Sequence, residues 1–414
     1  MRLPALALIL LATVVADAAY ARTALRVQYP NPATFRDVQN ALAERFERLH
    51  PDVDIVFDAP AASYEDMLQR TLRAGLTGDL PDVGVYAYSS ADTLAARGLL
   101  PPLSEQERAS LQAASALLED PEQGASACVP LAISVPLLYV NLDLVRRSGA
   151  EVPAEPTWSD IARIAAATAA APGGNAGVWL PLDVLSDWVW QILVESRGGH
   201  VIDPASGAIT AFTGPAAQAA LRDYVELAGP GYFFASSNQA VQALAGGKLA
   251  VMLVSNAVLK RLDSQVGGRF ARALWPTPVE GAGARRPVGG NCIAVLTRDP
   301  ARRAAALAYV RFLTGTEGGV MLARATGYLP PDPEAQRIFL ESLQPDVREA
   351  LEQSLAHGLS RWRSYPGRAG VRSPMLIRRT LEQIHLQPDR DPREALDRLS
   401  RKILQLAGRE EPAP

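Results

Sequence analysis

The stretch Cys128–Asn141, CVPLAISVPLLYVN, is an apolar segment interrupted by one small polar residue and two prolines. A continuous apolar run with such boundaries is typical of a buried strand, and Pro130 and Pro136 limit how much of it lies in mid-sheet. We interpret it as a connection that crosses between two lobes. Ser134 would then lie where the lobes meet, and its hydroxyl either faces a ligand or satisfies a backbone carbonyl.

The length and composition are those of a soluble protein with about two domains. A chain of 414 residues is too long for one ordinary core. Its 48% apolar and 21% charged residues exclude a disordered or fibrous protein. The formal net charge of −3 and the lack of a basic stripe give no electrostatic reason to expect nucleic acid or an anionic membrane surface as a partner.

The N-terminus has the pattern of a secretory signal peptide. Arg2 provides a positive start, residues 3–15 are almost wholly apolar, and Ala19-Tyr20-Ala21 has the small-x-small form of a cleavage site. The apolar run is shorter than the roughly 20 residues that a spanning helix needs. We therefore predict cleavage after Ala21, no transmembrane span, and release into the periplasm. The absence of a cysteine near this site argues against a lipid anchor.

Only two cysteines are present, Cys128 and Cys292, and an oxidising compartment permits them to pair. Their spacing alone leaves the pairing open, because it does not show how close the two Cα atoms come. The four histidines are scattered without the spacing of metal ligands, which favours structural or surface roles for them. They are His50, His200, His357 and His385.

The N-terminal part alternates strands and helices. Leu25–Tyr29, Val53–Phe57 and Asp82–Tyr88 are predicted strands, with a helix capped by Thr34 after the first and a helix from Tyr64 after the second. This order predicts an open, parallel α/β sheet. Ligands bind such sheets beyond the carboxyl ends of the strands, which here means Tyr29, residues 59–64 and residues 86–90.

The second part contains three further candidate ligand contacts. Trp188 and Trp190 are two residues apart on a predicted helix, so we expect one in the core and one facing a pocket. Ser255 follows a predicted strand, Leu249–Val254, at a helix start, where it either receives an anionic or hydroxyl-rich ligand or caps the helix. The paired glycines in residues 287–296 allow the backbone to approach a ligand or a neighbouring strand.

The sequence contains no GxSxG elbow, phosphate-binding GxxxxGK[ST] loop, HExxH or CxxC motif. Counting acidic residues does not exclude a glycosidase pair. The predicted ligand-facing loops nevertheless offer hydroxyls, aromatics, glycines and arginines, which suit holding a ligand rather than transforming it. A polar small molecule would be bound by aromatic stacking and by directed hydrogen bonds. The residues that could supply these contacts are Tyr64, Trp188, Tyr328, Ser134 and an arginine.

Eight segments in order carry a family resemblance. They are the signal peptide, FERLHPDVDIVF, YEDMLQRTLRAGLTGDLPDVGVY, LAARGLLPPL, SVPLLYVNLDLVRRSGAEVPAEPTWSDI, GGKLAVMLVSN, VGGNCIAVL and ATGYLPPDPEA. Together they cover nearly the whole mature chain and resemble the extracellular solute-binding proteins (family 1) of carbohydrate ABC importers, closest to the periplasmic glycerol-3-phosphate-binding subgroup. The resemblance implies a non-enzymatic, two-lobed α/β fold of type II-like form with crossing hinge strands. It also implies closure on a small polar ligand and delivery to an inner-membrane permease.

The resemblance to this subgroup also implies site residues. Its pocket falls on Tyr64, Ser134, Trp188, Ser255, Gly290 and Tyr328, and its phosphate-side arginine falls on Arg372 or Arg368, with Arg372 preferred. Two features depart from the subgroup: Ala87 replaces a Glu, and LSDWVW replaces WxxW. The expected ligand is therefore a sugar phosphate, glycerol-3-phosphate or a glycerophosphodiester. The alternatives are a neutral oligosaccharide, or a secreted glycoside or phosphodiester hydrolase.

We expect lobe 1 to comprise residues 22–132 with 291–331, and lobe 2 residues 133–290 with 332–414. The protein is expected to act as a monomer without a cofactor or metal. One lobe would hold the ligand first and closure would add the contacts of the other. The sequence leaves open whether a chemoreceptor is served as well.

Overall fold

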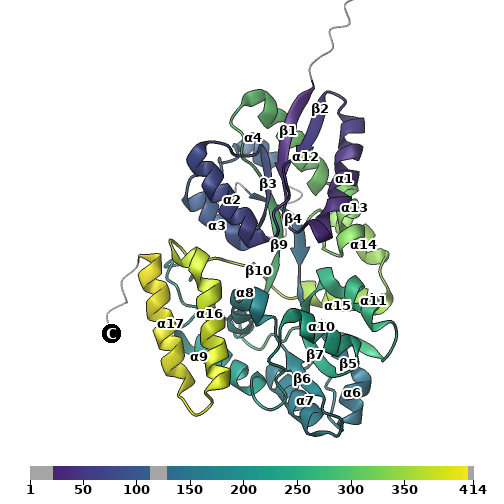
Figure 1. Ribbon diagram of the computed structural model, residues 1–414, viewed down its shortest axis with the longest axis vertical. Helices are drawn as coiled ribbons and strands as arrows, with labels where there is room; N and C mark the ends of the chain where they lie inside the picture. The colour runs from purple at the N-terminus through teal and green to yellow at the C-terminus, as the bar shows by residue number, and fades with distance from the viewer. Residues whose placement is uncertain (1–21, 112–127, 409–414) are drawn as a thin grey trace, which may run out of the picture.

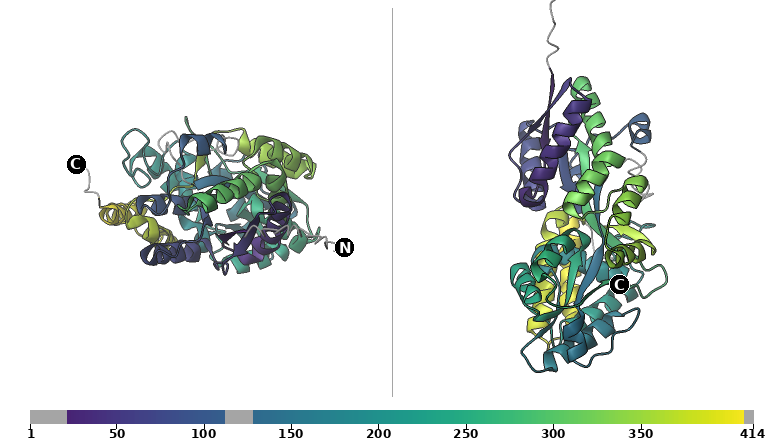
Figure 2. Two further views of the ribbon diagram at one scale, coloured as in Figure 1. Left: turned by 90° about the horizontal axis from the view of Figure 1, so that it is seen from above. Right: turned by 90° about the vertical axis from the view of Figure 1, so that its right-hand side faces the viewer.

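A computed structural model describes residues 22–111 and 128–408. The predicted signal peptide and its cleavage site lie outside the described residues. The molecule has two β-sheets, each covered by helices, and Figures 1 and 2 show the two bodies one above the other along the longest axis. We refer to each sheet with its covering helices as the first and the second lobe. The fold is therefore two-lobed and mixed α/β, as the sequence predicts.

The first sheet has the strand order β10-β9-β3-β1-β2, with β4 also paired to β9. Strands β1, β2 and β3 are parallel, whereas β9 runs antiparallel to β3 and to β4. The parallel part is the predicted open sheet. Its strands are β1 (Thr23–Gln28), β2 (Val53–Phe57), β3 (Val83–Ala87), β4 (Cys128–Ser134), β9 (Arg286–Val295) and β10 (Leu359–Arg361).

Helices cover both faces of the first sheet because the strands are apolar on both sides. Apolar side chains of α1, α12 and α13 pack on one face, and those of α2 and α3 pack on the other. Helix α4 lies at the outer end of this lobe (Figure 1). The bounds are α1 (Pro32–Leu49), α2 (Tyr64–Thr77), α3 (Tyr88–Ala96), α4 (Glu105–Ala109), α12 (Pro300–Thr314) and α13 (Thr316–Thr326).

The second sheet has the order β6-β7-β5-β8. Along β5, Leu138 and Val140 enter one core while Leu137 and Tyr139 enter the other, so alternate side chains fill both faces. The uninterrupted apolar run of this strand reflects that double burial. The strands are β5 (Pro136–Asn141), β6 (Ala176–Trp179), β7 (Leu249–Ser255) and β8 (Arg272–Pro276).

Ten α-helices and a 3-10 turn accompany the second sheet in the described residues. One face carries α7, α8, α9, α16 and α17, and the other carries α10, α11, α14 and α15. The bounds are α6 (Leu142–Arg147), α7 (Trp158–Ala170), α8 (Leu182–Glu195), α9 (Gly214–Leu227), α10 (Ser237–Ala245), η3 (Asn256–Val258), α11 (Leu259–Val266), α14 (Pro333–Glu341), α15 (Pro345–Leu355), α16 (Ala369–Leu386) and α17 (Pro392–Ala407).

The stretch Cys128–Asn141 connects the lobes, but as two strands rather than one. Its first half, β4, pairs with β9 in the first sheet, and its second half, β5, pairs with β7 and β8 in the second sheet. Only Val135 separates them. Pro136 begins the second strand, where a missing N–H is tolerated. The prolines therefore mark the passage between sheets.

Cys128 and Cys292 form a disulfide, with their Cα atoms 5.4 Å apart. They lie on adjacent antiparallel strands, β4 and β9. The bond therefore joins the two strands that reach the lobe junction, and it answers the question that the spacing of the cysteines leaves open.

Two local predictions are wrong at their boundaries. The first helix begins at Pro32 rather than after Thr34, because Asn31 adopts a left-handed conformation and Pro32 occupies the first turn. The third strand ends at Ala87, and Tyr88 already begins α3.

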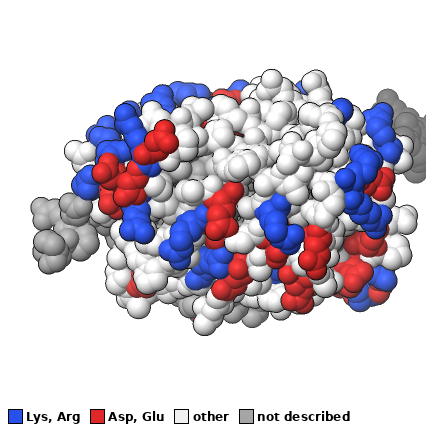
Figure 3. Space-filling model, turned by 90° about the horizontal axis from the view of Figure 1, so that it is seen from below, with Lys and Arg blue, Asp and Glu red and all other residues white. Residues whose placement is uncertain are grey.

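The surface seen from below in Figure 3 carries basic and acidic side chains close to one another rather than one large area of a single sign. Within residues 22–111 and 128–408, no helix combines the length and the apolar character needed to cross a bilayer.

Candidate functional site

Two glycines of β9 shape the place where the lobes meet. Gly289 pairs with Ser134 across the sheet, and a Cβ atom on Gly289 would lie 2.9 Å from the Ser134 Oγ and 3.4 Å from the Trp188 ring. Gly290 has a φ of +112°, and a Cβ atom there would lie 2.0 Å from the Ala132 carbonyl oxygen. Neither position has room for a side chain. We call the region around Ser134, Gly289 and Gly290 the lobe junction.

Tyr64 and Tyr328 lie together on the first-lobe side of the junction. Asn291, which follows Gly290, donates from Nδ2 to the Tyr64 hydroxyl at 2.8 Å. The Tyr328 hydroxyl lies beside that of Tyr64, and its ring stacks on Phe35 at 5.9 Å between centroids. Burial raises the pKa of both phenols, so both stay protonated at neutral pH and can donate hydrogen bonds.

Trp188 lies on the second-lobe side, beneath Gly289. It is 2% exposed, and its Nε1 donates to the Pro287 carbonyl at 2.9 Å. Trp190 is also buried and donates to the Ala211 carbonyl at 2.8 Å. Both indoles belong to the same hydrophobic core, so burial does not distinguish the one expected in the core from the one expected at a pocket. Residues two apart diverge around α8, and each indole donates to a different carbonyl.

Ser255 lies next to the junction as the last residue of β7. Its hydroxyl accepts from the Ala257 backbone N–H at 3.2 Å, which is the capping role that the sequence leaves open. The segment that it caps is the three-residue turn η3, and α11 follows directly from Leu259.

Asn256, which the sequence did not single out, makes the lobe-crossing contacts at this point. Its Oδ1 accepts from the Val135 N–H at 2.8 Å, and its Nδ2 donates to the Gly327 carbonyl at 2.7 Å. It thereby ties the second sheet to the loop that carries Tyr328.

The two predicted arginines are exposed side chains in the structure. Arg368 and Arg372 are both exposed, at the start of α16. Arg361 of β10 is more enclosed: its side chain is 9% exposed, it pairs with Asp92 of α3 at 2.8 Å, and it donates to the Tyr88 carbonyl at 3.3 Å. Arg361 therefore ties strand β10 to helix α3.

Helix α8 holds the segment that contains Arg361. Asp187, Gln191 and Glu195 are spaced four residues apart, so they share one face of α8, and all three are buried. Asp187 accepts a hydrogen bond from the Trp362 Nε1 at 3.0 Å. Gln191 accepts from the Arg363 N–H at 3.0 Å and donates to the Arg361 carbonyl at 2.9 Å. Glu195 accepts from the Ser360 hydroxyl.

Burial raises the pKa of the Asp187 carboxyl to about 6, and it also raises the pKa of Glu195. This face of α8 therefore fixes residues 360–363 through polar contacts in a region from which water is largely excluded.

Sequence reasoning missed Tyr88, Asn291, Arg361 and Asp187. Two of them carried a signal: Tyr88 lies in the flagged strand end 86–90, and Asn291 is a polar residue inside the apolar stretch that follows the paired glycines. Arg361 carried none, because its burial depends on the pairing of β10 with the distant strand β9.

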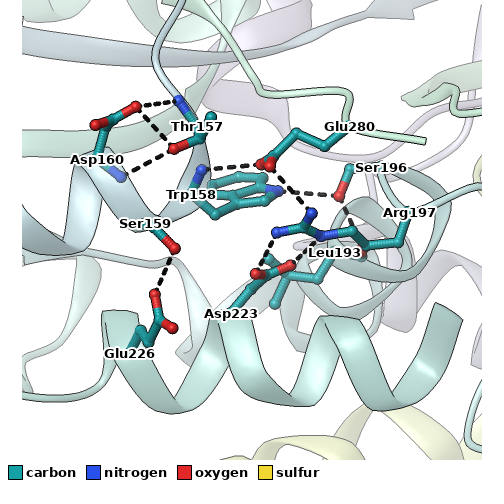
Figure 4. A network of polar contacts seen from close by, with 10 residues as sticks. All are labelled: Thr157, Trp158, Ser159, Asp160, Leu193, Ser196, Arg197, Asp223, Glu226 and Glu280. Atoms are coloured by element: carbon teal, nitrogen blue, oxygen red, sulfur yellow. Dashed lines mark hydrogen bonds and ion pairs between the residues drawn. The ribbon is translucent and has the colours of Figure 1, made fainter. Parts of the chain in front are cut away.

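A second polar network lies inside the second lobe and is structural (Figure 4). The Arg197 guanidinium donates to Asp223 at 2.6 Å and to Glu280 at 3.0 Å. The Trp158 indole donates to the Ser196 hydroxyl at 2.9 Å, and the Trp158 backbone N–H donates to Glu280 at 3.1 Å. Each charge in this network is paired, so the network joins α7, α8 and α9 rather than forming a binding site.

Comparison with solved structures supports the fold. UgpB from Mycobacterium tuberculosis in complex with glycerophosphocholine is similar over 92% of this chain and 98% of its own, with a TM-score of 0.75 and 22% identity. The sugar-binding protein MalE from Xanthomonas citri is similar over 93% and 98%, with a TM-score of 0.75 and 16% identity. The two-lobed architecture is therefore that of periplasmic binding proteins.

Comparison of sequences gives the family. The periplasmic sn-glycerol-3-phosphate-binding proteins of Salmonella typhimurium and Escherichia coli strain K12 are 22% and 23% identical, over 73% and 70% of this chain and equal shares of their own. These relatives are substrate-binding proteins, not enzymes. The profile of the bacterial extracellular solute-binding proteins matches residues 41–348. This match covers most of the chain, and the chain belongs to the family of bacterial extracellular solute-binding proteins.

Proposed function

We propose that the protein captures a small hydroxylated solute that carries a phosphate, for delivery to an ABC permease of the inner membrane. The solute class comprises sugar phosphates, glycerol-3-phosphate and glycerophosphodiesters. The relatives named for sn-glycerol-3-phosphate and the solved complex with glycerophosphocholine support this class. The protein would act as a periplasmic monomer, after removal of residues 1–21.

The observation that carries the proposal is the polar group at the lobe junction. Tyr64, Asn291 and Tyr328 provide neutral donors and acceptors on one side, and Ser134 contributes a buried hydroxyl. Arg361 lies beside Tyr88, whose carbonyl accepts from its guanidinium at 3.3 Å. Neutral hydroxyls and amides that converge beside one guanidinium suit a solute with hydroxyls at one end and an anionic group at the other.

The division into lobes remains the one expected from the sequence. Lobe 1 would comprise residues 22–132 with 291–331, and lobe 2 residues 133–290 with 332–414. Contacts at Asn256–Gly327 and Arg361–Asp92 cross this division on two sides of the junction. A solute that bridges Tyr64 and Tyr328 on one lobe and the Trp188 and Ser255 side on the other would favour the closed arrangement.

A neutral oligosaccharide is the second candidate. Arg368 and Arg372 are exposed, and Arg361 already pairs with Asp92, so the positive charge at the junction is balanced. Solved relatives of the same fold include a complex with cycloalternan and one with maltose.

A thermal-shift screen separates the two candidates. The panel contains sn-glycerol-3-phosphate, glycerophosphocholine, glucose 6-phosphate, maltose and acarbose. A solute present at about 100 times its Kd stabilises the folded protein by about 2.7 kcal/mol, so we expect the phosphate-bearing solutes to raise the Tm by a few degrees. The Arg361→Gln variant should lose this shift, whereas Arg372→Gln, altered at an exposed arginine, should keep it. Stabilisation by maltose or acarbose alone would establish the second candidate instead, and stabilisation by none would contradict the proposal.

A further inference from the structure

Two buried polar atoms at the lobe junction have no hydrogen-bond partner among the described residues. They are the Tyr88 hydroxyl and the Asn291 Oδ1. Tyr88 is 2% exposed and Asn291 is fully buried. A buried polar atom without a partner is costly, so native proteins rarely keep one unless a water, ion or ligand satisfies it. Two such atoms on neighbouring residues of the junction therefore point to an occupant.

Both atoms belong to residues that are neighbours at the end of strand β3. Asn291 is hydrogen-bonded to the Tyr64 hydroxyl through Nδ2, which leaves Oδ1 available. Tyr88 follows Ala87, the residue that pairs with Asn291, and its carbonyl accepts from the Arg361 guanidinium at 3.3 Å. Ala87 pairs directly with Asn291 across the sheet and ends in a methyl group, so the neighbouring strand supplies no partner there.

The free atoms limit which chemical group can satisfy them. Asn291 Oδ1 can only accept, so its partner must carry a proton, which a phosphate diester oxygen does not. The Tyr88 hydroxyl can donate to the same group. A solute hydroxyl satisfies both atoms, since it donates one hydrogen bond and accepts another.

We propose that the Tyr88 hydroxyl and the Asn291 Oδ1 form a subsite for one hydroxyl group of the captured solute, at its glycerol or sugar end. This inference rests on the proposed function, because it assumes that a hydroxylated solute enters the junction. It assigns roles to two residues that were absent from the site predicted by sequence, and it places the phosphate elsewhere, toward Arg361.

The test is a Tyr88→Phe variant, which removes one oxygen and keeps the ring. We expect calorimetric titration to show about tenfold weaker binding of glycerophosphocholine, because the loss of one hydrogen bond in a buried site changes the affinity by about that factor. Two analogues that each lack one free glycerol hydroxyl identify the group bound. The wild type should prefer glycerophosphocholine over one of them, and Tyr88→Phe should lose that preference.

Two matched tyrosines of the same lobe serve as controls. Tyr86 is buried and its hydroxyl is bonded to Thr71 at 3.1 Å, whereas the buried Tyr309 hydroxyl on α12 has no partner among the described residues. We expect Tyr86→Phe to lower the Tm, and Tyr309→Phe and Tyr88→Phe to leave it unchanged or raise it. Only Tyr88→Phe should weaken solute binding.

The outcomes separate the inference from the function on which it rests. If wild type binds glycerophosphocholine and Tyr88→Phe binds it equally well, the subsite is overturned and the proposed function stands. A drop in Tm for Tyr88→Phe like that of Tyr86→Phe would show that an ordered water already satisfies the hydroxyl, which also overturns the subsite. If wild type binds no solute of the panel, the proposed function fails and the subsite fails with it.

Discussion

Replacing Trp188 by alanine is expected to lower the free energy of unfolding by about 3–5 kcal/mol, as truncation of a fully buried large side chain does. The indole is 2% exposed, packs under Gly289 and near Trp362, and donates to the Pro287 carbonyl. The substitution leaves a cavity and an unsatisfied carbonyl together. Urea unfolding followed by circular dichroism measures the loss.

The same substitution should weaken solute binding, because Trp188 lies directly against the backbone of the lobe junction. We expect a loss on the order of 1–3 kcal/mol in binding free energy, the range for a buried aromatic anchor. Trp190→Ala is the matched control: it removes an equally buried indole on the same helix, bonded to the Ala211 carbonyl.

Both alanine variants should lose similar stability, and only Trp188→Ala should lose affinity in calorimetric titration at a temperature where both are folded. If Trp188→Ala is too unstable to titrate, Trp188→Phe provides the same comparison with a smaller cavity. Equal affinity in the Trp188 and Trp190 variants would remove Trp188 from the solute site.

Asp187→Asn is expected to make the protein less sensitive to pH between about 4 and 6.5. Burial raises the pKa of Asp187 from 3.8 to about 6 in the folded protein. Because the folded state then binds the proton more tightly than the unfolded state, the stability that Asp187 contributes is complete below pH 3.8 and is lost as pH rises through 6. About two pKa units correspond to about 3 kcal/mol.

The measurement is urea unfolding of wild type and Asp187→Asn at pH 4.5 and pH 7. The stability of the variant relative to wild type should increase by up to about 3 kcal/mol at the higher pH. Glu195 titrates in both proteins and cancels in this difference. Trp362→Phe removes the donor that stabilises the Asp187 carboxylate, so it should move the pH window upward. A difference that is the same at both pH values would contradict this account of α8.

The elements that were predicted well from the sequence are those whose ends are marked by nearby residues, such as a helix cap, a glycine or a change from apolar to polar residues. Helix α2 begins at Tyr64 as expected because Ser63 caps it, and it ends where Gly78 adopts a left-handed conformation. Strand β2 matches its prediction because its apolar residues are bounded by polar ones. The two-lobed fold followed from such segments taken in order.

The parts of the site that could not be predicted depend on contacts between distant segments. Strand β10 has three residues, too few for a recognisable pattern, and it forms by pairing with Arg286–Val288 of β9. That pairing buries Arg361, while Arg368 and Arg372 remain exposed. The family resemblance implied an arginine at the pocket, whereas the pairing of β10 with β9 places Arg361 beside α3.

The central claim is that the solute binds at the lobe junction. A crystal structure of the protein in complex with a solute tests this claim most directly, and the solute to use is the one in the panel that raises the Tm most. We predict one solute molecule between Tyr64 and Tyr328 on one side and the Trp188 and Ser255 side on the other, chemically unaltered, with one hydroxyl group at Asn291. A solute bound on an outer face of either lobe, with the junction filled by side chains alone, would contradict the account.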